Sequence, residues 1–256
     1  MSTLLRINQL KRSFGGIRAI DDVSFSVRNG IITGVIGPNG AGKTTLFNLI
    51  AGFYKPTSGS VVFNDQAITG RSAATIARYG LVRTFQMTQV FSGYSVYENL
   101  YRAALFRQFP KPWQLFTPAT VQAGRTRARQ TTEYALELIG LSQVADTEAS
   151  SLAYGLQKIL GVGMALTAQP KALLMDEPAA GLNPVETEEM SSLIERIHQT
   201  GVDIVVVEHD MGLVMRLCKD LVVLVNGQLL ATGPTEQVKQ NPEVIDAYLG
   251  ADLEEA

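Results

Sequence analysis

Gly37-Pro38-Asn39-Gly40-Ala41-Gly42-Lys43-Thr44 has the spacing G-x-x-x-x-G-K-[ST] that is typical of a phosphate-binding loop. The apolar run before it, Ile31–Ile36, predicts a buried strand, and Leu46–Ala51 after it predicts a helix. Glycines allow successive backbone N–H groups to converge on phosphate oxygens, and the start of a helix adds the positive end of its dipole. This strand, loop and helix therefore predict a site for the phosphates of a nucleotide.

The residue types in and after this loop suit a triphosphate with magnesium. We expect the Lys43 ammonium to neutralise the β- and γ-phosphates and the Thr44 hydroxyl to ligate Mg²⁺. The residues expected to contact ATP here are Gly37, Pro38, Asn39, Gly40, Ala41, Gly42, Lys43, Thr44 and Thr45. The alternative, a glycine-rich turn with an incidental lysine, does not account for the strand and helix on either side.

Two acids follow a second apolar run, Ala172–Met175, which predicts another buried strand. Asp176 at the carboxyl end of such a strand would lie beside the phosphate loop and hold Mg²⁺. Glu177 would orient or deprotonate the attacking water. A strand that ends in solvated acids is common, so only the combination with the phosphate loop gives the pair this function.

The rest of the pattern predicts an α/β fold, a P-loop NTPase core with a mostly parallel sheet. Further buried strands are expected at Asp203–Val207 and Leu221–Val225, and helices at Thr187–Gln199 and Met211–Cys218. Three partly alternating segments predict a small antiparallel β subdomain at the N-terminus: Leu4–Leu10, Val23–Val27 and Val61–Phe63. Asn226-Gly227 predicts a hairpin into Gln228–Ala231.

One domain, 1–256, is expected to contain all of these elements. About 88–166 lacks a buried-strand signal and is expected to be an inserted helical subdomain. Residues 1–87 and 167–256 would then form the core together with the antiparallel subdomain.

Composition excludes several classes of protein. The 46% hydrophobic content rules out a disordered chain, and a net charge of −2 argues against a globally basic nucleic-acid binder, so no nucleic-acid partner is expected. A single cysteine, Cys218, excludes an internal disulfide and a Cys-based zinc site, and two histidines exclude a His-rich metal cage. No apolar run reaches the roughly 18 residues of a spanning helix, and no secretory signal is visible, so we expect a cytoplasmic protein.

Five further elements occur in the order in which they occur in ATP-binding-cassette ATPases, and the chain resembles that family over about Leu5 to Leu249. They are Phe14, Gln86, the segment Leu152-Ala153-Tyr154-Gly155-Leu156-Gln157, the loop Ala180-Gly181-Leu182-Asn183, and His209. The resemblance implies that Phe14 stacks on adenine, that Gln86 contacts Mg²⁺ and the transport partner, and that His209 reaches the γ-phosphate. Taken alone, these three would be read as a packed aromatic, a loop residue and a strand-end histidine.

The resemblance also implies a composite site. In the family, ATP lies between the phosphate loop of one subunit and the signature segment, here Leu152–Gln157, of another, and the loop Ala180–Asn183 communicates across the dimer. A homodimer, or a heterodimer with a paralogous ATPase, is therefore expected. The implied catalytic residues are Glu177, His209 and Lys43, and the implied metal ligands are Thr44, Gln86 and Asp176.

A narrower resemblance is to the cytoplasmic ATPase of bacterial branched-chain amino-acid importers. The segments that carry it, besides Leu152–Gly155, are Arg83–Gln86, Glu177–Pro184, Glu208–Met211 and Asn241–Gly250. It implies two membrane permease subunits, indirect work with a periplasmic substrate-binding protein, and a peripheral position on the inner face of the membrane. ATPases of urea, amide and aromatic-acid uptake systems share these segments. An exporter ATPase, a cassette ATPase without a transport role, and a P-loop kinase or GTPase remain as alternatives.

The chain departs from most cassettes within its signature segment, where this subgroup commonly has alanine, and from the subgroup itself after that segment. Ala153 stands where most cassettes have a serine, so backbone N–H groups around Gly155 must supply the contact to the γ-phosphate. Gly161 and Met164 stand where the subgroup usually has glutamate and arginine. Glycines inside a helix each cost about 1 kcal/mol relative to alanine, which predicts a looser helix and slower ATP turnover.

The stretch Leu100–Thr132 contains no acid. Its six cations are Arg102, Arg107, Lys111, Arg125, Arg127 and Arg129, and its interleaved aromatics are Phe106, Phe109, Trp113 and Phe116. A solvated face with a few packed aromatic rings is the plainest interpretation. Contact with anionic lipid or the membrane partner, and contact with nucleic acid, are the alternatives.

Overall fold

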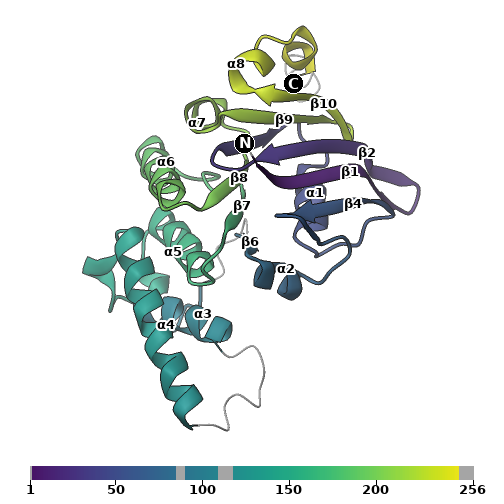
Figure 1. Cartoon of the computed structure of the whole chain (residues 1–256). Helices are drawn as coiled ribbons and strands as arrows, with labels where there is room; N and C mark the ends of the chain where they lie inside the picture. Colours follow the sequence, from purple (N-terminus) through teal and green to yellow (C-terminus); the bar gives the residue numbers. More distant parts are fainter. Residues whose placement is uncertain (1, 85–89, 109–117, 248–256) are drawn as a thin grey trace.

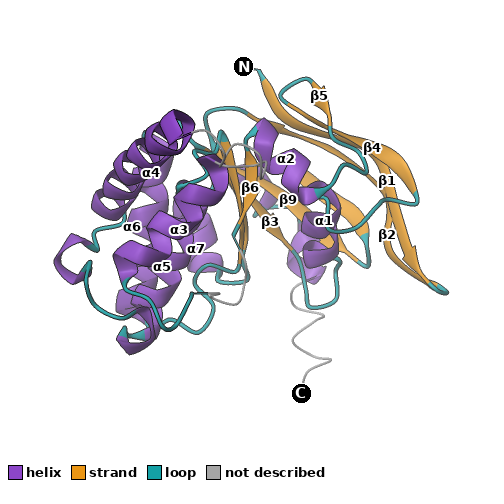
Figure 2. Ribbon diagram, turned by 90° about the horizontal axis from the view of Figure 1, so that it is seen from below, coloured by secondary structure: helices purple, strands orange, loops and turns teal. Residues whose placement is uncertain are grey.

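The computed structural model describes residues 2–84, 90–108 and 118–247. Its elements form three layers, which Figure 2 shows side by side: a helical layer, a parallel sheet, and an antiparallel sheet with helix α1 between the two sheets. Within these residues no helix is long and apolar enough to cross a membrane.

The antiparallel sheet is built from the N-terminal part of the chain. Its strands are β1 (Thr3–Phe14), β2 (Ile17–Arg28), β4 (Ser58–Phe63) and β5 (Gln66–Ala67), in the order β2-β1-β4-β5. The predicted antiparallel sheet is confirmed, and β1 and β2 are longer than the alternating pattern indicated. They extend because Phe14 pairs with Ile17 across a tight turn, in which Gly15 adopts a φ of 58°.

The parallel sheet carries the apolar runs rich in valine, leucine and isoleucine. Its strands are β3 (Ile32–Ile36), β6 (Leu81–Arg83), β7 (Ala172–Asp176), β8 (Asp203–Val207), β9 (Asp220–Val225) and β10 (Gln228–Pro234). The order is β10-β9-β3-β8-β7-β6, and every neighbouring pair except β10 with β9 is parallel. The predicted α/β fold and the hairpin at Asn226-Gly227 are both confirmed.

The helices cover both faces of this sheet (Figure 1). They are α1 (Lys43–Ile50), α2 (Ala73–Tyr79), α3 (Val96–Gln108), α4 (Pro118–Leu138), α5 (Tyr154–Leu166), α6 (Pro184–Gln199), α7 (Met211–Leu217) and α8 (Thr235–Val238), with short 3₁₀ turns at Ser142–Val144 and Ala149–Ser151. Helices α3, α4 and α5 form the helical layer, and the basic side chains Arg125, Arg127 and Arg129 are exposed on α4. Arg102, Phe106 and Arg107 of the basic-aromatic stretch lie on α3, and Phe106 is exposed, whereas residues 109–117 lie outside the described part of the chain.

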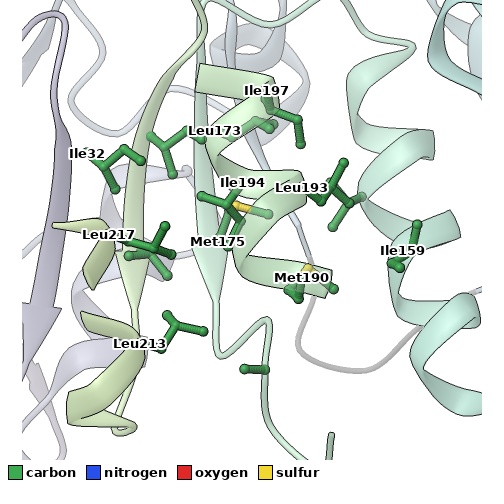
Figure 3. Close-up of a cluster of buried hydrophobic side chains, with 14 of the residues drawn as sticks. Ile32, Ile159, Leu173, Met175, Met190, Leu193, Ile194, Ile197, Leu213 and Leu217 are labelled. Atoms are coloured by element: carbon green, nitrogen blue, oxygen red, sulfur yellow. The ribbon is translucent and has the colours of Figure 1, made fainter. Parts of the chain in front are cut away.

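Two separate hydrophobic cores result, one on each face of the parallel sheet. Strand β7 contributes to both, because Leu173 and Met175 face one core while Ala172 and Leu174 face the other. Figure 3 shows the first core, where Met175 meets Met190 and Ile194 of α6. The second core packs α1 between the two sheets.

Two contacts join the sheets to each other. The Arg28 guanidinium, at the end of β2, donates to both carboxylate oxygens of Asp220 at the start of β9, at 2.8 and 2.5 Å. The backbone N–H of Asp21 donates to the carbonyl oxygen of Gly227 at 2.8 Å. The carboxyl ends of β3, β6, β7 and β8 lie at one edge of the parallel sheet, and the functional residues gather there.

Candidate functional site

The phosphate loop, residues 37–42, connects β3 to α1 and has the backbone geometry that its glycines predict. Gly37, Gly40 and Gly42 have φ values of 150°, 76° and 97°. A Cβ atom on Gly37 would lie 2.1 Å from the carbonyl oxygen of Leu224, and one on Gly42 would lie 2.6 Å from that of Ala19. The loop is therefore packed against neighbouring backbone at two points where only glycine fits.

Gly37→Ala should destabilise the protein by about 1–3 kcal/mol, because the new Cβ atom collides with backbone that cannot rotate away. Urea unfolding of the nucleotide-free protein measures the effect. Gly16→Ala is the matched control, because its Cβ atom would have nothing within 4 Å. Equal stability of the two variants would contradict the tight packing of the loop.

Lys43 begins helix α1, and its side chain lies back over the loop. Its Nζ donates to the carbonyl oxygens of Gly37 at 2.7 Å and Pro38 at 3.0 Å. Burial lowers the pKa of Lys43, while the charges of Glu177 and Asp176 raise it. The ammonium is thus held by the carbonyl groups of the loop, where the charges of both predicted acids act on it.

A cavity of about 530 Å³ opens over the loop. It is lined by Ile17, Arg18, Ala19, Asn39, Gly40, Ala41, Gly42, Lys43, Thr44, Thr45, Glu177, Asn226 and Gly227. The structure therefore brings Glu177 to the same hollow as the loop residues, although they are far apart in sequence. Arg18 and the turn Asn226-Gly227 are lining residues that the sequence reasoning did not place here.

Asp176 and Glu177 occupy the end of β7 with different environments. Asp176 is buried, and its Oδ2 accepts from the Arg83 guanidinium at 2.6 Å, while its Oδ1 has no hydrogen-bond partner among the described residues. Glu177 has a left-handed backbone with a φ of 49°, and its N–H donates to the carbonyl oxygen of Val207 at 2.9 Å. A carboxylate oxygen and the hydroxyl of Thr44 are the hard donors that Mg²⁺ prefers, so these residues fit the ion.

Arg83 is a further member of the site that sequence reasoning used only as part of a resemblance. Besides Asp176, its guanidinium donates to the side chain of Asn48 on α1 at 2.6 Å and lies over the Phe53 ring at 5.6 Å. The Arg83 side chain is 8% exposed. This buried cation ties three elements together: β6, β7 and the helix that follows the phosphate loop.

Two further predicted residues, His209 and Phe14, lie at the carboxyl ends of strands in the two sheets. His209 follows β8 and its side chain is 62% exposed, and Phe14 ends β1 and packs edge-on against Tyr54 with 5.3 Å between ring centroids. The Arg12 guanidinium lies over the Phe14 ring at 4.5 Å. Neither His209 nor Phe14 lines the cavity, and Gln86 lies outside the described residues.

The segment Leu152–Gln157 leads into α5, which begins at Tyr154, and does not line the cavity as far as the structure describes it. Leu152 and Gly155 are buried, whereas Ala153 and Tyr154 are exposed. A Cβ atom on Gly181 would lie 3.3 Å from the Tyr154 ring, so this segment packs beside the loop Ala180–Asn183 of its own chain. The side chain of Asn183 caps α6, which therefore begins at Pro184, earlier than predicted.

Helix α5 contains Gly161 and Gly163, the two glycines inside the helix that predicted a loose helix. Packing explains why position 163 is glycine, because a Cβ atom there would lie 2.5 Å from Ile139 and 3.0 Å from Leu100. Gly161 and Met164 are half-buried on the same helix. The helix runs without interruption from Tyr154 to Leu166.

Gly161→Glu combined with Met164→Arg should raise ATP turnover by up to about fivefold, the rate equivalent of the 1 kcal/mol that glycine costs a helix. Steady-state phosphate release from both proteins measures it. Gly163→Ala is a useful contrast, because it also removes a glycine but creates a collision with Ile139. Unchanged turnover in the double variant would remove the idea that this helix limits the rate.

Comparison with known proteins gives consistent matches. A profile described as ABC transporter matches residues 20–180, and one described as branched-chain amino acid ATP-binding cassette transporter matches residues 228–254. The high-affinity branched-chain amino acid transport ATP-binding protein LivG of Escherichia coli (strain K12) is 42% identical, over 96% of this chain and 98% of that one. BraF of Pseudomonas aeruginosa, described in the same words, is 39% identical over the same shares.

Solved structures agree in fold. The ADP conformation of an ATP-binding cassette of an ABC transporter superimposes with a TM-score of 0.84 at 32% identity, covering 98% of this chain and 100% of that one. A nucleotide-free ATP-binding cassette from an ABC transporter gives a TM-score of 0.80 at 32% identity, covering 96% and 99%.

Proposed function

The chain belongs to the ATP-binding-cassette family of ABC transporters, and from this premise we propose that it is the ATPase subunit of a bacterial importer of branched-chain amino acids, or of a related small polar or aromatic-acid substrate. Chains of this family hydrolyse ATP to drive transport. The observation that carries the narrower proposal is the match of residues 228–254 to the branched-chain amino acid profile. That match favours import over the exporter and non-transport alternatives.

ATP binding is assigned to the cavity over the phosphate loop. The backbone N–H groups of Gly37 and of residues 39–45 would hold the phosphates, with the dipole of α1 aimed at them. Lys43 would exchange its two loop carbonyl partners for phosphate oxygens. Phe14 would stack on the adenine, beside the Tyr54 and Arg12 side chains that already pack against it.

Hydrolysis is assigned to Glu177, His209 and Lys43. Glu177 lines the cavity and would accept a proton from the attacking water. His209 and Lys43 would stabilise the negative charge that spreads over the phosphate oxygens as the bond breaks. Bound Mg²⁺, for which Thr44, Asp176 and Gln86 are the proposed ligands, would supply further positive charge to these oxygens.

A second subunit is needed because one chain supplies only part of the site. The exposed start of α5, with the backbone N–H groups near Ala153 and Tyr154, does not line the cavity of its own chain but suits the phosphates of a partner's nucleotide. We therefore propose a head-to-tail homodimer or a heterodimer with a paralogue. The loop Ala180–Asn183 would contact the partner at the same interface.

Transport would be completed by two membrane permease subunits and, indirectly, a periplasmic substrate-binding protein. The chain would lie on the inner face of the cell membrane, with Gln86 and the helical subdomain, about 88–166, facing the permeases. Closing and reopening of the dimer would be the motion passed to them. No nucleic-acid partner is proposed.

Deletion of the gene in its host should abolish high-affinity uptake of radiolabelled leucine, isoleucine and valine. The wild-type gene should restore uptake and the Glu177→Gln gene should not. Parallel assays with urea, a short amide and an aromatic acid identify the substrate if branched-chain uptake is unaffected. Loss of efflux rather than uptake would contradict an importer.

A further inference from the structure

Glu177 has an unusual backbone for a residue that carries a side chain. Its φ of 49° lies in the left-handed region, which L residues other than glycine, asparagine and aspartate seldom adopt. Such a conformation persists only where the surrounding structure holds it. The direction in which the Glu177 side chain leaves the backbone depends in part on this torsion, so the groups that hold the peptide also help to orient the carboxylate.

Two buried charged side chains form hydrogen bonds with the backbone of the turn that follows Glu177. On one side, the Nζ of Lys158 donates to the carbonyl oxygens of Glu177 and Pro178, each at 3.2 Å. On the other side, the Glu208 carboxylate accepts from the N–H of Ala179 at 2.8 Å. Lys158 is 6% exposed and Glu208 is 1% exposed, so water cannot replace these bonds readily.

Burial of these two groups is unfavourable in itself. It lowers the pKa of Lys158 and raises the pKa of Glu208, in each case as the largest effect on that group. The mutual attraction of the charges offsets part of the Lys158 shift, because Glu208 and then Glu177 raise its pKa. Apolar side chains at positions 158 and 208 would avoid the cost of burying two charges. What only the charged side chains can provide is the set of hydrogen bonds to the backbone of residues 177–179.

Each group also belongs to another functional segment. Lys158 lies on α5 one turn after Tyr154, and its Nζ is 5.5 Å from the centre of the Tyr154 ring. Glu208 precedes His209 and accepts from the His209 N–H at 3.2 Å. Lys158 and Glu208 therefore connect the signature segment, the turn after Glu177 and His209 within one chain.

We propose that Lys158 and Glu208 are positioning residues that hold the Glu177 peptide in its left-handed conformation, and that Lys158 links the start of α5 to the Glu177 carboxylate of the same chain. The inference rests on the proposed role of Glu177 as the general base. If a partner's nucleotide contacts Tyr154 and shifts its ring, Lys158 would pass that shift to the Glu177 peptide.

Lys158→Met tests the proposal by comparison with Lys158→Arg, which keeps a donor, and with Lys219→Met, an exposed lysine outside the site. Lys158→Met should lower kcat about ten- to hundredfold, the scale of a misplacement near 1 Å, with nucleotide Kd changed less than about threefold. Lys158→Arg should recover most of the loss, and Lys219→Met should match the wild type. Unchanged kcat in Lys158→Met would overturn the proposal.

A double variant separates positioning from a general loss of structure. If Lys158 acts through Glu177, then adding Lys158→Met to Glu177→Gln should leave the residual hydrolysis of Glu177→Gln unchanged. A further loss of the same size as in the wild-type background would contradict action through Glu177. Wild-type protein that neither binds nor hydrolyses ATP would instead contradict the proposed function.

If Lys158→Met does not fold, Glu208→Gln provides the second variant, because its side-chain oxygen can still accept from Ala179. Glu208→Gln should lower kcat less than tenfold with nucleotide Kd maintained, and its loss should also vanish in the Glu177→Gln background. An additive loss would overturn the proposal.

Discussion

Glu177→Gln should reduce ATP hydrolysis by about 10²–10⁴-fold while ATP binding is retained. The amide has the size and shape of the carboxylate but cannot accept a proton from the attacking water. Binding should be maintained because the loop N–H groups and Lys43, which the change does not alter, are the groups proposed to hold the phosphates. Phosphate release and fluorescent-nucleotide titration measure the two properties separately.

The same variant should accumulate as a dimer when ATP and Mg²⁺ are supplied, because the proposed closed pair would reopen only after hydrolysis. Size-exclusion chromatography with and without nucleotide measures this. Glu195→Gln is the control, since Glu195 is an exposed glutamate on α6 away from the cavity. Hydrolysis near the wild-type rate would show that Glu177 is not the base, and a persistent monomer would contradict the composite site.

Arg83→Met should lower the free energy of unfolding of the nucleotide-free protein by about 3–5 kcal/mol. The change leaves Asp176 buried without its ion-paired guanidinium, and Asp176 already has one oxygen without a hydrogen-bond partner in the described structure. It also removes the hydrogen bond to Asn48. Urea unfolding followed by far-UV circular dichroism measures the loss.

The double variant Arg83→Met with Asp176→Leu should recover most of the free energy of unfolding that Arg83→Met loses. It removes both charges, so neither is left buried without its ion-pair partner. Arg18→Met is the control: Arg18 pairs with Asp21 at 3.1 Å, but its side chain is 74% exposed, and such surface pairs contribute little. If Arg83→Met unfolds at the same urea concentration as Arg18→Met, the buried pair does not stabilise the fold.

The parts of the site that lie close together in sequence could be predicted from the sequence. The phosphate loop needs glycines at fixed positions between a strand and a helix, and these signals all fall within residues 31–51. Asp176 and Glu177 could be placed because they end an apolar run. His209 and Phe14 could be identified only through resemblance, since neither has a local pattern that distinguishes it.

The buried charges could not be predicted, because their partners are distant in sequence. Arg83 and Asp176 are 93 positions apart, and Lys158 and Glu177 are 19 apart. Strand β6 has only three residues and contains Arg83, so it gave no apolar run to recognise. The early start of α6 was missed although Asn183 and Glu186 have capping-box spacing, because the apolar face begins only at Met190.

Hydrogen bonds join the two sheets at separate points, between Arg28 and Asp220 and between Asp21 and Gly227. Phe14 on β1 and the phosphate loop after β3 therefore belong to two sheets that are hydrogen-bonded to each other. We expect motion during the proposed ATP cycle to occur between these sheets and helices α3–α5. A chemical cross-link between β2 and β9 should leave the ATP cycle intact, whereas one between α5 and α6 should stop it.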